Sequence, residues 1–203
     1  MATIVRLTLA LLLTLNSVQL IADTLTIPKV GYLVRYDTRL GVPILTDYVL
    51  PRSLLRRISS RRGMTFYPDR ALPRPQVSPS CYNRSGYDRG HNVPAADMAG
   101  NPVLMLETFA MSNVSPQTPD FNRHRWKNVE ILVRSLARRY GSVRVQTIPL
   151  FVNIDTLWLP CHHVAIPDGY RKRVYSWPTN QLLMDTILWQ RRNNRGASAI
   201  ITP

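Results

Sequence analysis

The segment from residue 120 to residue 140 constrains the fold more than any other part of this sequence. Its apolar residues recur at helical spacing and fall on one face, namely Trp126, Val129, Leu132, Val133 and Leu136. Asp120, which follows Thr118 and Pro119, is expected to cap the helix, and Gly141 is expected to end it. The sequence therefore predicts one long amphipathic helix.

Strand-like segments lie on both sides of this helix. Residues 30–36 and 43–50 read as two strands joined by a turn, and residues 143–149, 157–165 and 170–176 read as three more. A short helix is expected over Val103–Phe109, a strand over Ala110–Ser115, and a second helix over Asn180–Arg191. Strands grouped before and after one long helix predict a single α+β domain with a central, mainly antiparallel sheet.

The net charge of the chain indicates which classes of binding partner to expect. The chain has 203 residues, with 26 Lys and Arg against 12 Asp and Glu, a net charge of +14. Such an excess points to polyanions, with nucleic acid first and an anionic membrane second, although a protein that is merely basic is the alternative. A hydrophobic content of 45% excludes a wholly disordered chain, and one apolar stretch excludes a polytopic membrane protein.

That apolar stretch lies at the N-terminus. Arg6 precedes the apolar run Leu7–Leu15, and a more polar segment ends at Ala22. This order predicts a secretory signal peptide over residues 1–22, with cleavage after Ala22 and a mature domain over residues 23–203. An uncleaved anchor is the alternative. The expectation is therefore a secreted or extracytoplasmic protein with no stable membrane insertion after cleavage.

The chain has two cysteines, Cys81 and Cys161. In an oxidising compartment they could form one disulfide, which would close a loop of about 80 residues and add ~4 kcal/mol in the chain-entropy model. Two buried free thiols are the alternative.

Several polar residues match what phosphodiester hydrolysis requires: a base for water, cations on the phosphate, and charge for the transition state. A neutral imidazole at His91 suits the base, and Gly90 beside it would let a substrate backbone approach. Arg89 can pair with phosphate. Asn122 offers a neutral oxygen to a hard cation such as Mg²⁺, and Glu130, about 12 Å further along the helix, is placed to hold a metal-bound water.

These residues occur in ordered blocks: Asp88-Arg89-Gly90-His91, then Ser112–Gln117, then Asn122, Trp126 and Glu130. In these blocks, which span about residues 28–175, the sequence resembles the DNA/RNA non-specific endonucleases of the ββα-metal, or His-Me finger, superfamily. The resemblance implies a ββα-metal motif within the α+β domain.

The resemblance also implies a role for each site residue. His91 matches the general base that activates water, and Asn122 matches the sole direct protein ligand of Mg²⁺, with Mn²⁺ as an alternative ion. Glu130 matches the carboxylate that holds the water shell of the metal. Arg89 matches the arginine that supports the phosphate and the transition state, and Asn113 matches an asparagine that orients groups near His91.

Other positions leave alternatives or depart from the family. Asp88 is interpreted as mainly structural, and either Arg61 or Arg62 matches a further upstream arginine. Family members commonly carry a Thr-Gly pair after the strand that follows the long helix, where this chain has Thr147-Ile148-Pro149. His124 is interpreted as a surface residue, and the pair at positions 162 and 163 as structural.

The sequence thus predicts a secreted, Mg²⁺-dependent endonuclease that binds DNA and RNA through backbone phosphates and leaves 5′-phosphate ends. Because phosphates carry no base information, no sequence specificity is expected. The alternatives are a non-catalytic nucleic-acid-binding protein that keeps the fold, and a membrane-surface protein that uses the basic stretch of residues 51–62. Oligomeric state and a protein inhibitor are left open.

Overall fold

The computed structural model describes residues 23–56, 59–153, 155–190 and 200–201. Its centre is a seven-stranded sheet with the order β1-β2-β3-β6-β9-β10-β11, in which all neighbours run antiparallel. The strands are β1 (Thr24–Pro28), β2 (Leu33–Asp37), β3 (Val42–Pro51), β6 (Ser142–Leu150), β9 (Gly169–Ser176), β10 (Leu182–Trp189) and β11 (Ile200–Ile201). The predicted α+β class with a mainly antiparallel sheet is confirmed.

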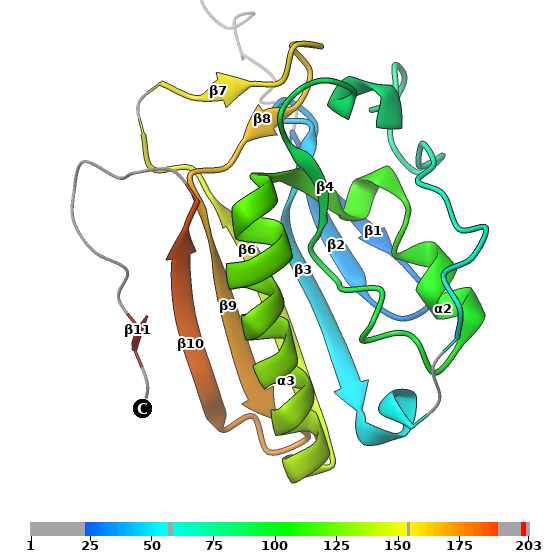
Figure 1. Cartoon of the computed structure of the whole chain (residues 1–203), viewed down its shortest axis with the longest axis vertical. Coiled ribbons are helices and arrows are strands. Elements are labelled where there is room, and N and C mark those ends of the chain that lie inside the picture. Colours follow the sequence, from blue (N-terminus) through cyan, green and yellow to red (C-terminus); the bar gives the residue numbers. More distant parts are fainter. Residues whose placement is uncertain (1–22, 57–58, 154, 191–199, 202–203) are drawn as a thin grey trace, which may run out of the picture.

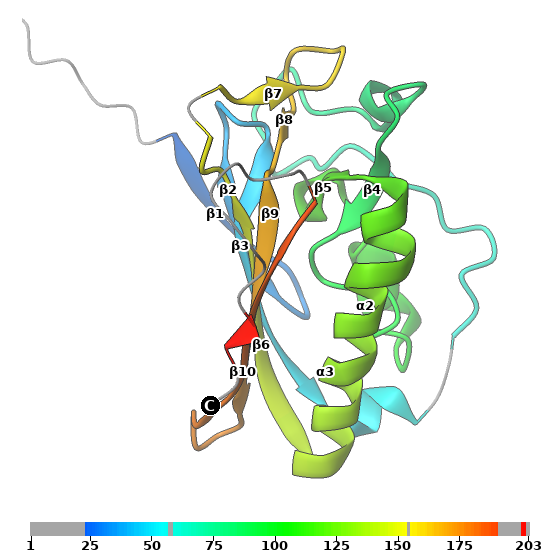
Figure 2. The ribbon, with the colours of Figure 1, turned by 60° about the vertical axis from the view of Figure 1, so that its left-hand side comes forward.

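The remaining elements form a second layer on one face of this sheet (Figures 1 and 2). The longest is α3 (Lys127–Tyr140), which continues a π-helical turn, η4 (Phe121–Trp126). A small antiparallel pair, β4 (Asp88–His91) and β5 (Val114–Gln117), lies beside α3. Shorter elements complete the layer: η1 (Arg52–Leu55), η2 (Pro79–Tyr82), α2 (Pro102–Glu107), η3 (Met111–Asn113), β7 (Leu157–Trp158) and β8 (Ala165–Ile166).

Strand periodicity explains how the two layers pack. In β6, Val143 and Val145 are fully buried and belong to the same core cluster as Val133 and Ala137 of α3. The alternate residues of a strand point to the opposite face, and there Arg144 pairs with Asp47 of β3. One face of the sheet is thus apolar and covered by α3, and the other carries ion pairs. Within the described residues, no helix combines the length and apolar character needed to cross a membrane.

The second predicted helix is wrong, because residues 182–189 form strand β10. This segment pairs with β9 from Leu182 opposite Tyr175 to Trp189 opposite Gly169, and Asp185 binds Arg171 of β9. The backbone groups of the β9 edge give this segment a ladder partner that the sequence of the segment does not reveal.

Two other elements also differ from the sequence prediction. The strand expected over residues 157–165 is instead two short strands, β7 and β8, which pair with each other across a tight turn. Residues 111–113 form the 3-10 turn η3 before β5 begins at Val114.

The start of the long helix differs in a way that matters for the site. Asp120 has helical backbone angles and makes no side-chain cap bond, so the predicted cap is wrong. The first turn is π-helical, and Phe121 and Trp126 stack there with ring centroids 5.5 Å apart. In the regular helix that follows, Val133 and Ala137 are buried, whereas Leu132, which was predicted on the same apolar face, is 49% exposed.

Candidate active site

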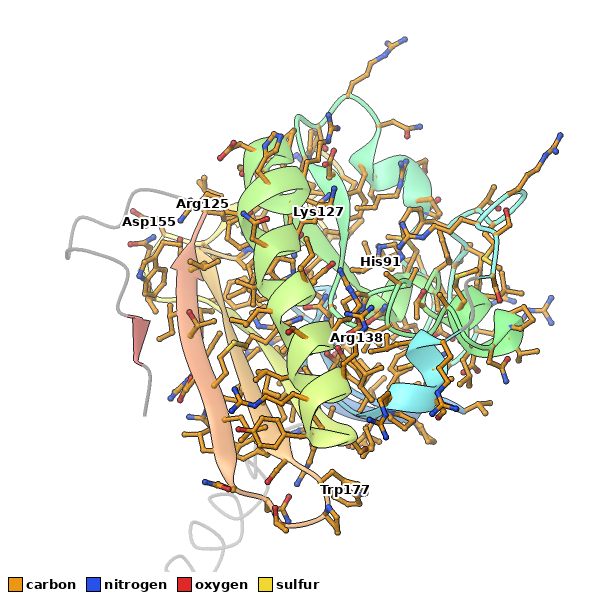
Figure 3. The ribbon with its side chains drawn as sticks, turned by 60° about the horizontal axis from the view of Figure 1, so that its bottom comes forward. His91, Arg125, Lys127, Arg138, Asp155 and Trp177 are labelled. Atoms are coloured by element: carbon orange, nitrogen blue, oxygen red, sulfur yellow. The ribbon has the colours of Figure 1, made fainter. Side chains whose placement is uncertain are left out.

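A pocket of about 360 Å³ lies between β4, the residues that follow it and the helix formed by η4 and α3. This His91 pocket is lined by Arg61, His91, Pro94, Ala95, Ala96, Asn122, Arg123, Lys127, Glu130 and Arg134. The structure therefore brings together three of the predicted site residues, His91, Asn122 and Glu130. Figure 3 shows His91 beside α3, on the same side of the helix as Lys127.

His91 is held in place by aromatic packing. Its ring lies between Phe66 and Phe109, with both ring centroids 5.0 Å away. Its Nε2 atom is buried and has no hydrogen-bond partner among the described residues, so Nδ1 is the ring nitrogen available to the pocket. Burial, together with the positive charge of Arg61, lowers the pKa of His91 to about 3. The imidazole is therefore neutral near pH 7 and able to accept a proton.

Asn122 is oriented by Asp88. The Asn122 Nδ2 group donates to Asp88 Oδ2 at 2.9 Å, and Arg123 donates to both oxygens of the same carboxylate. Although burial opposes it, these hydrogen bonds hold the pKa of Asp88 below its usual range. Because the N–H side of the amide is engaged, its oxygen is the atom left for a cation. This arrangement agrees with the structural role expected of Asp88.

Glu130 lies on the same wall of the pocket, one helical turn before Arg134. Its side chain is 17% exposed, and its Oε2 lies 3.9 Å from Nη1 of Arg134. Burial and the negative charge of Asp97 raise the pKa of Glu130 to about 7. The positive charges of Lys172, Arg134 and Arg61 oppose this rise. The Glu130 carboxyl group is thus partly protonated near pH 7, and a further cation nearby would favour its ionised form.

Sequence reasoning missed Arg134 as a site residue. Its Nη1 donates to the fully buried Asp97 at 2.8 Å, and Asp97 also accepts a hydrogen bond from the Tyr48 hydroxyl at 2.6 Å. Asp97 therefore fixes the guanidinium at the pocket wall. The spacing of four residues from Glu130 was the signal that could have identified Arg134, because such residues share a helix face.

Two predicted residues, Arg89 and Asn113, do not line the His91 pocket. Arg89 donates to the Pro79 carbonyl and the Asn83 side chain, which ties β4 to η2. This geometry supports an anchoring role for Arg89 rather than contact with phosphate.

Asn113 is fully buried. Its Oδ1 accepts from the Val93 backbone N–H, and its Nδ2 donates to the carbonyls of Val93 and Thr108. It braces the chain two residues after His91 and so acts on the base through the backbone.

Gly90 has a packing role that the sequence did not suggest. The residue is buried, and a Cβ atom there would lie 2.3 Å from Cδ of the fully buried Gln117 side chain on the paired strand. The packing of Gln117 therefore favours glycine at this position.

The two candidate upstream arginines differ in their position relative to the pocket. Arg61 lines the pocket, whereas Arg62 does not. At Thr147 the chain departs from the Thr-Gly pair that is common in the family. The Thr147 hydroxyl donates to the carbonyl of Asn92 at 2.9 Å. Thr147 thus supports the residue next to His91 even without a following glycine.

The donor set at the pocket fits a hydrated divalent cation. Asn122 offers one neutral oxygen and Glu130 one carboxylate, and within the described residues no three His, Cys, Asp or Glu side chains gather into a metal site. Mg²⁺ keeps several waters and takes few protein ligands, so this set suits it. His124, His162 and His163 are exposed and lie outside the His91 pocket.

The two cysteines are free thiols in this structure. Both are half-buried against the same apolar cluster, and burial together with the neighbouring Cys161 raises the pKa of the Cys81 thiol to about 11.

Known proteins are similar to this chain in sequence and in fold. The chain is 42% identical over 125 residues to "Nuclease 1, mitochondrial" of Schizosaccharomyces pombe, which covers 60% of this chain and 39% of that protein. It is 35% identical over 155 residues to "Endonuclease G, mitochondrial" of Bos taurus, covering 71% and 52%. The chain thus spans about half the length, or less, of these curated relatives.

A solved structure is also similar. "Crystal structure of the EndoG/EndoGI complex: Mechanism of EndoG inhibition" aligns with a TM-score of 0.76 and 25% identity, covering 85% of this chain and 77% of that one. The inhibitor named in that title is an inhibitor of the similar protein.

The prediction of a secreted protein is wrong by this comparison, because several of the curated relatives are mitochondrial nucleases. Residues 1–22, for which the sequence predicts a signal peptide, lie outside the described residues. The apolar run that suggests export is a compositional signal, and it does not identify the receptor that reads it.

A family model described as "DNA/RNA non-specific endonuclease" matches residues 16–196. That range takes in the large sheet from β1 to β10 as well as β4, β5 and α3. On this match the chain belongs to the DNA/RNA non-specific endonuclease family.

Proposed function

We propose that this protein is a metal-dependent endonuclease that hydrolyses the phosphodiester bonds of DNA and RNA without sequence preference. The observation that carries the proposal is that a neutral imidazole, His91, and an oriented amide, Asn122, line one pocket with Glu130. Family membership and relatives named as nucleases support the same activity. They also support a mitochondrial location rather than an exported one.

In the proposed mechanism, His91 takes a proton from a water molecule as that water attacks the phosphorus atom. The bond from phosphorus to the 3′-oxygen breaks, and the 3′-oxygen takes a proton from solvent water, which leaves a 5′-phosphate and a 3′-hydroxyl. Arg61 and Arg134 on the pocket wall offset the charge that builds up on the phosphate oxygens. Asn122 would hold Mg²⁺, with Glu130 facing the water shell, and the ion would supply Lewis-acid stabilisation of the transition state.

Digestion of supercoiled plasmid and of RNA by the purified full chain tests this proposal. We expect cleavage with Mg²⁺, none with EDTA, and products that can be ligated without added kinase, because they carry 5′-phosphates. His91→Ala should lower the rate by about 10²–10⁴-fold, the usual contribution of a general base. His124→Ala, on the exposed face of η4, is the matched control.

The competing function is nucleic-acid binding without catalysis. It predicts a gel shift of plasmid and RNA with no strand cleavage in any metal. Cleavage by His91→Ala at the wild-type rate would remove the proposed mechanism while leaving a nuclease.

A further inference from the structure

A second pocket, of about 400 Å³, adjoins the His91 pocket. The two share Arg61 and Arg134, and the second continues along α3 to Arg138, so we call it the Arg138 pocket. Figure 3 shows Lys127 and Arg138 towards opposite ends of α3, with His91 beside the helix. A polymer with its reacting group at His91 would therefore extend into the Arg138 pocket.

One side of the Arg138 pocket is cationic. Arg134 and Arg138 are four residues apart on α3, which places them about 6 Å apart along the helix axis. Arg134 is engaged by Asp97, whereas Arg138 is exposed and has no ion pair or hydrogen bond among the described residues. An uncompensated guanidinium beside a pocket is suited to an anionic ligand, and its planar donor set matches phosphate.

The other side is apolar. The half-buried Leu54 and Leu55 of η1 line it, and Ala99 and Met105 lie deeper, within the core. A cationic wall facing an apolar wall is complementary to a nucleotide, which has a charged phosphate and a flat apolar base. An acidic peptide would use the arginine and leave the leucines without a partner.

We propose that the Arg138 pocket is a nucleotide subsite that binds the unit next to the scissile phosphate. Arg138 pairs with the neighbouring phosphate, and the base lies against Leu54 and Leu55. This inference rests on the proposed function, since it assumes that the scissile phosphate binds beside His91.

Arg139 provides a matched control for Arg138. The two arginines are adjacent, exposed and near the same helix end, but Arg139 does not line the pocket and its guanidinium lies 5.6 Å from the Tyr140 ring. Arg138→Gln and Arg139→Gln therefore remove the same charge from the chain and differ only in position.

The experiment compares two substrates with the full chain and both variants. A dinucleoside monophosphate carries the scissile phosphate but no neighbouring phosphate for Arg138, whereas a longer single-stranded oligonucleotide carries both. For the oligonucleotide, Arg138→Gln should raise KM about tenfold, leave kcat unchanged and reduce the salt slope by about one. It should leave the dinucleoside monophosphate unaffected, and Arg139→Gln should match wild type on both.

The base contact has its own measurement. An oligonucleotide with an abasic unit beside the cleaved bond should show a raised KM with wild type, and Arg138→Gln should raise KM further. Unchanged KM for the abasic substrate, or equal effects of Arg138→Gln and Arg139→Gln, would overturn the nucleotide subsite.

Two further outcomes separate the nucleotide subsite from a site for an acidic protein and from a failure of the proposed function. Weaker inhibition of Arg138→Gln by polyglutamate, with an unchanged oligonucleotide KM, would assign the pocket to an acidic protein and overturn our proposal. If wild type cleaves neither substrate, the proposed function fails, and fluorescence titration of the oligonucleotide in EDTA with the same variants then decides the subsite. Cleavage of both substrates with no effect of Arg138→Gln would refute the subsite alone.

Discussion

His91 depends on its surroundings for its protonation state. An exposed histidine is partly charged near neutral pH, but Phe66 and Phe109 enclose this ring and Arg61 adds a positive charge. Both effects disfavour the imidazolium. The cost is a buried Nε2 atom that has no partner among the described residues, which is the kind of unfavourable local feature that proteins retain at functional sites.

Replacing Arg61 should change the pH dependence of cleavage. Its positive charge lowers the pKa of both His91 and Glu130, so Arg61→Gln raises both. The acidic limb of the kcat/KM profile should then move to higher pH, because the base and the carboxylate both need to be unprotonated. At neutral pH we expect kcat/KM to fall roughly 10²-fold through lost stabilisation of phosphate charge.

Arg62→Gln is the control for this measurement, because Arg62 lies outside the pocket. An acidic limb that stays in place in Arg61→Gln would contradict the electrostatic role of Arg61.

Asp88 should affect the Mg²⁺ concentration that cleavage requires. Asp88→Ala removes the acceptor that holds the Asn122 amide, and loss of such a supporting contact typically costs 10–100-fold in metal affinity or activity. We expect the Mg²⁺ concentration for half-maximal cleavage to rise roughly tenfold, with recovery of kcat at saturating Mg²⁺. Metal titrations of Asp88→Ala beside Arg123→Ala, which removes only the exposed partner, test this. Equal Mg²⁺ dependence in Asp88→Ala and wild type would refute it.

At the scale of elements, the π turn η4 sets the relation between Asn122 and Glu130. Asn122 lies within the turn and Glu130 lies in the first turn of α3. If this segment were a regular α-helix, Asn122 would have a different rotation about the helix axis relative to Glu130, because each residue advances the helix by about 100° and 1.5 Å. The stack of Phe121, Trp126 and Tyr170 holds the turn in place.

Deleting His124 should convert this π turn into an ordinary α turn. We expect activity to fall by more than ~10²-fold, since a displacement of about 1 Å at a reacting group can have this effect. Circular dichroism should still show a folded, helical protein.

His124→Ala keeps the residue count and should retain activity, because the His124 side chain is exposed and, among the described residues, hydrogen-bonds only to Asp120. Full activity of the deletion variant would show that the π turn does not position the site.

At the scale of the whole molecule, the sheet is a scaffold and the site lies in the layer that covers it. The open face of the sheet carries Arg–Asp pairs such as Arg144 with Asp47 and Arg171 with Asp185. The covered face supports α3 and also reaches the site: Thr147 of β6 donates to the Asn92 carbonyl, and the positive charge of Lys172 on β9 acts on Glu130. The ion pairs on the open face lie apart from the site.

Oxidation should join the two cysteines, because both pack against the same apolar cluster and Cys161 is close enough to raise the pKa of Cys81. A disulfide exchange with oxidised glutathione would link η2 to the turn between β7 and β8 and close a loop of 161 − 81 = 80 residues. The loop-entropy model gives up to ~4 kcal/mol, so Tm should rise by several degrees. Non-reducing peptide maps and thermal melts, with Cys81→Ser as control, test this. Two thiols that stay titratable after oxidation would contradict it.

Much of the fold and the site could be predicted from sequence where a local pattern carries the information. The alternation in β6 and the apolar spacing in α3 report burial directly, and the block from Asp88 to His91 identifies the base. The predictions from sequence failed where contacts with a segment distant in the sequence determine the local structure. Residues 182–189 became a strand through pairing with β9, and Arg89 is bound by the Pro79 carbonyl.

The sequence by itself determined the family, the charge and the candidates for the reacting groups, because these depend on residue type and order. Only the tertiary structure decided which of the two arginines lines the His91 pocket, what packs against residue 90, and that a second pocket continues along α3. Those properties depend on distances between side chains far apart in the chain, and packing sets such distances only once the core has formed.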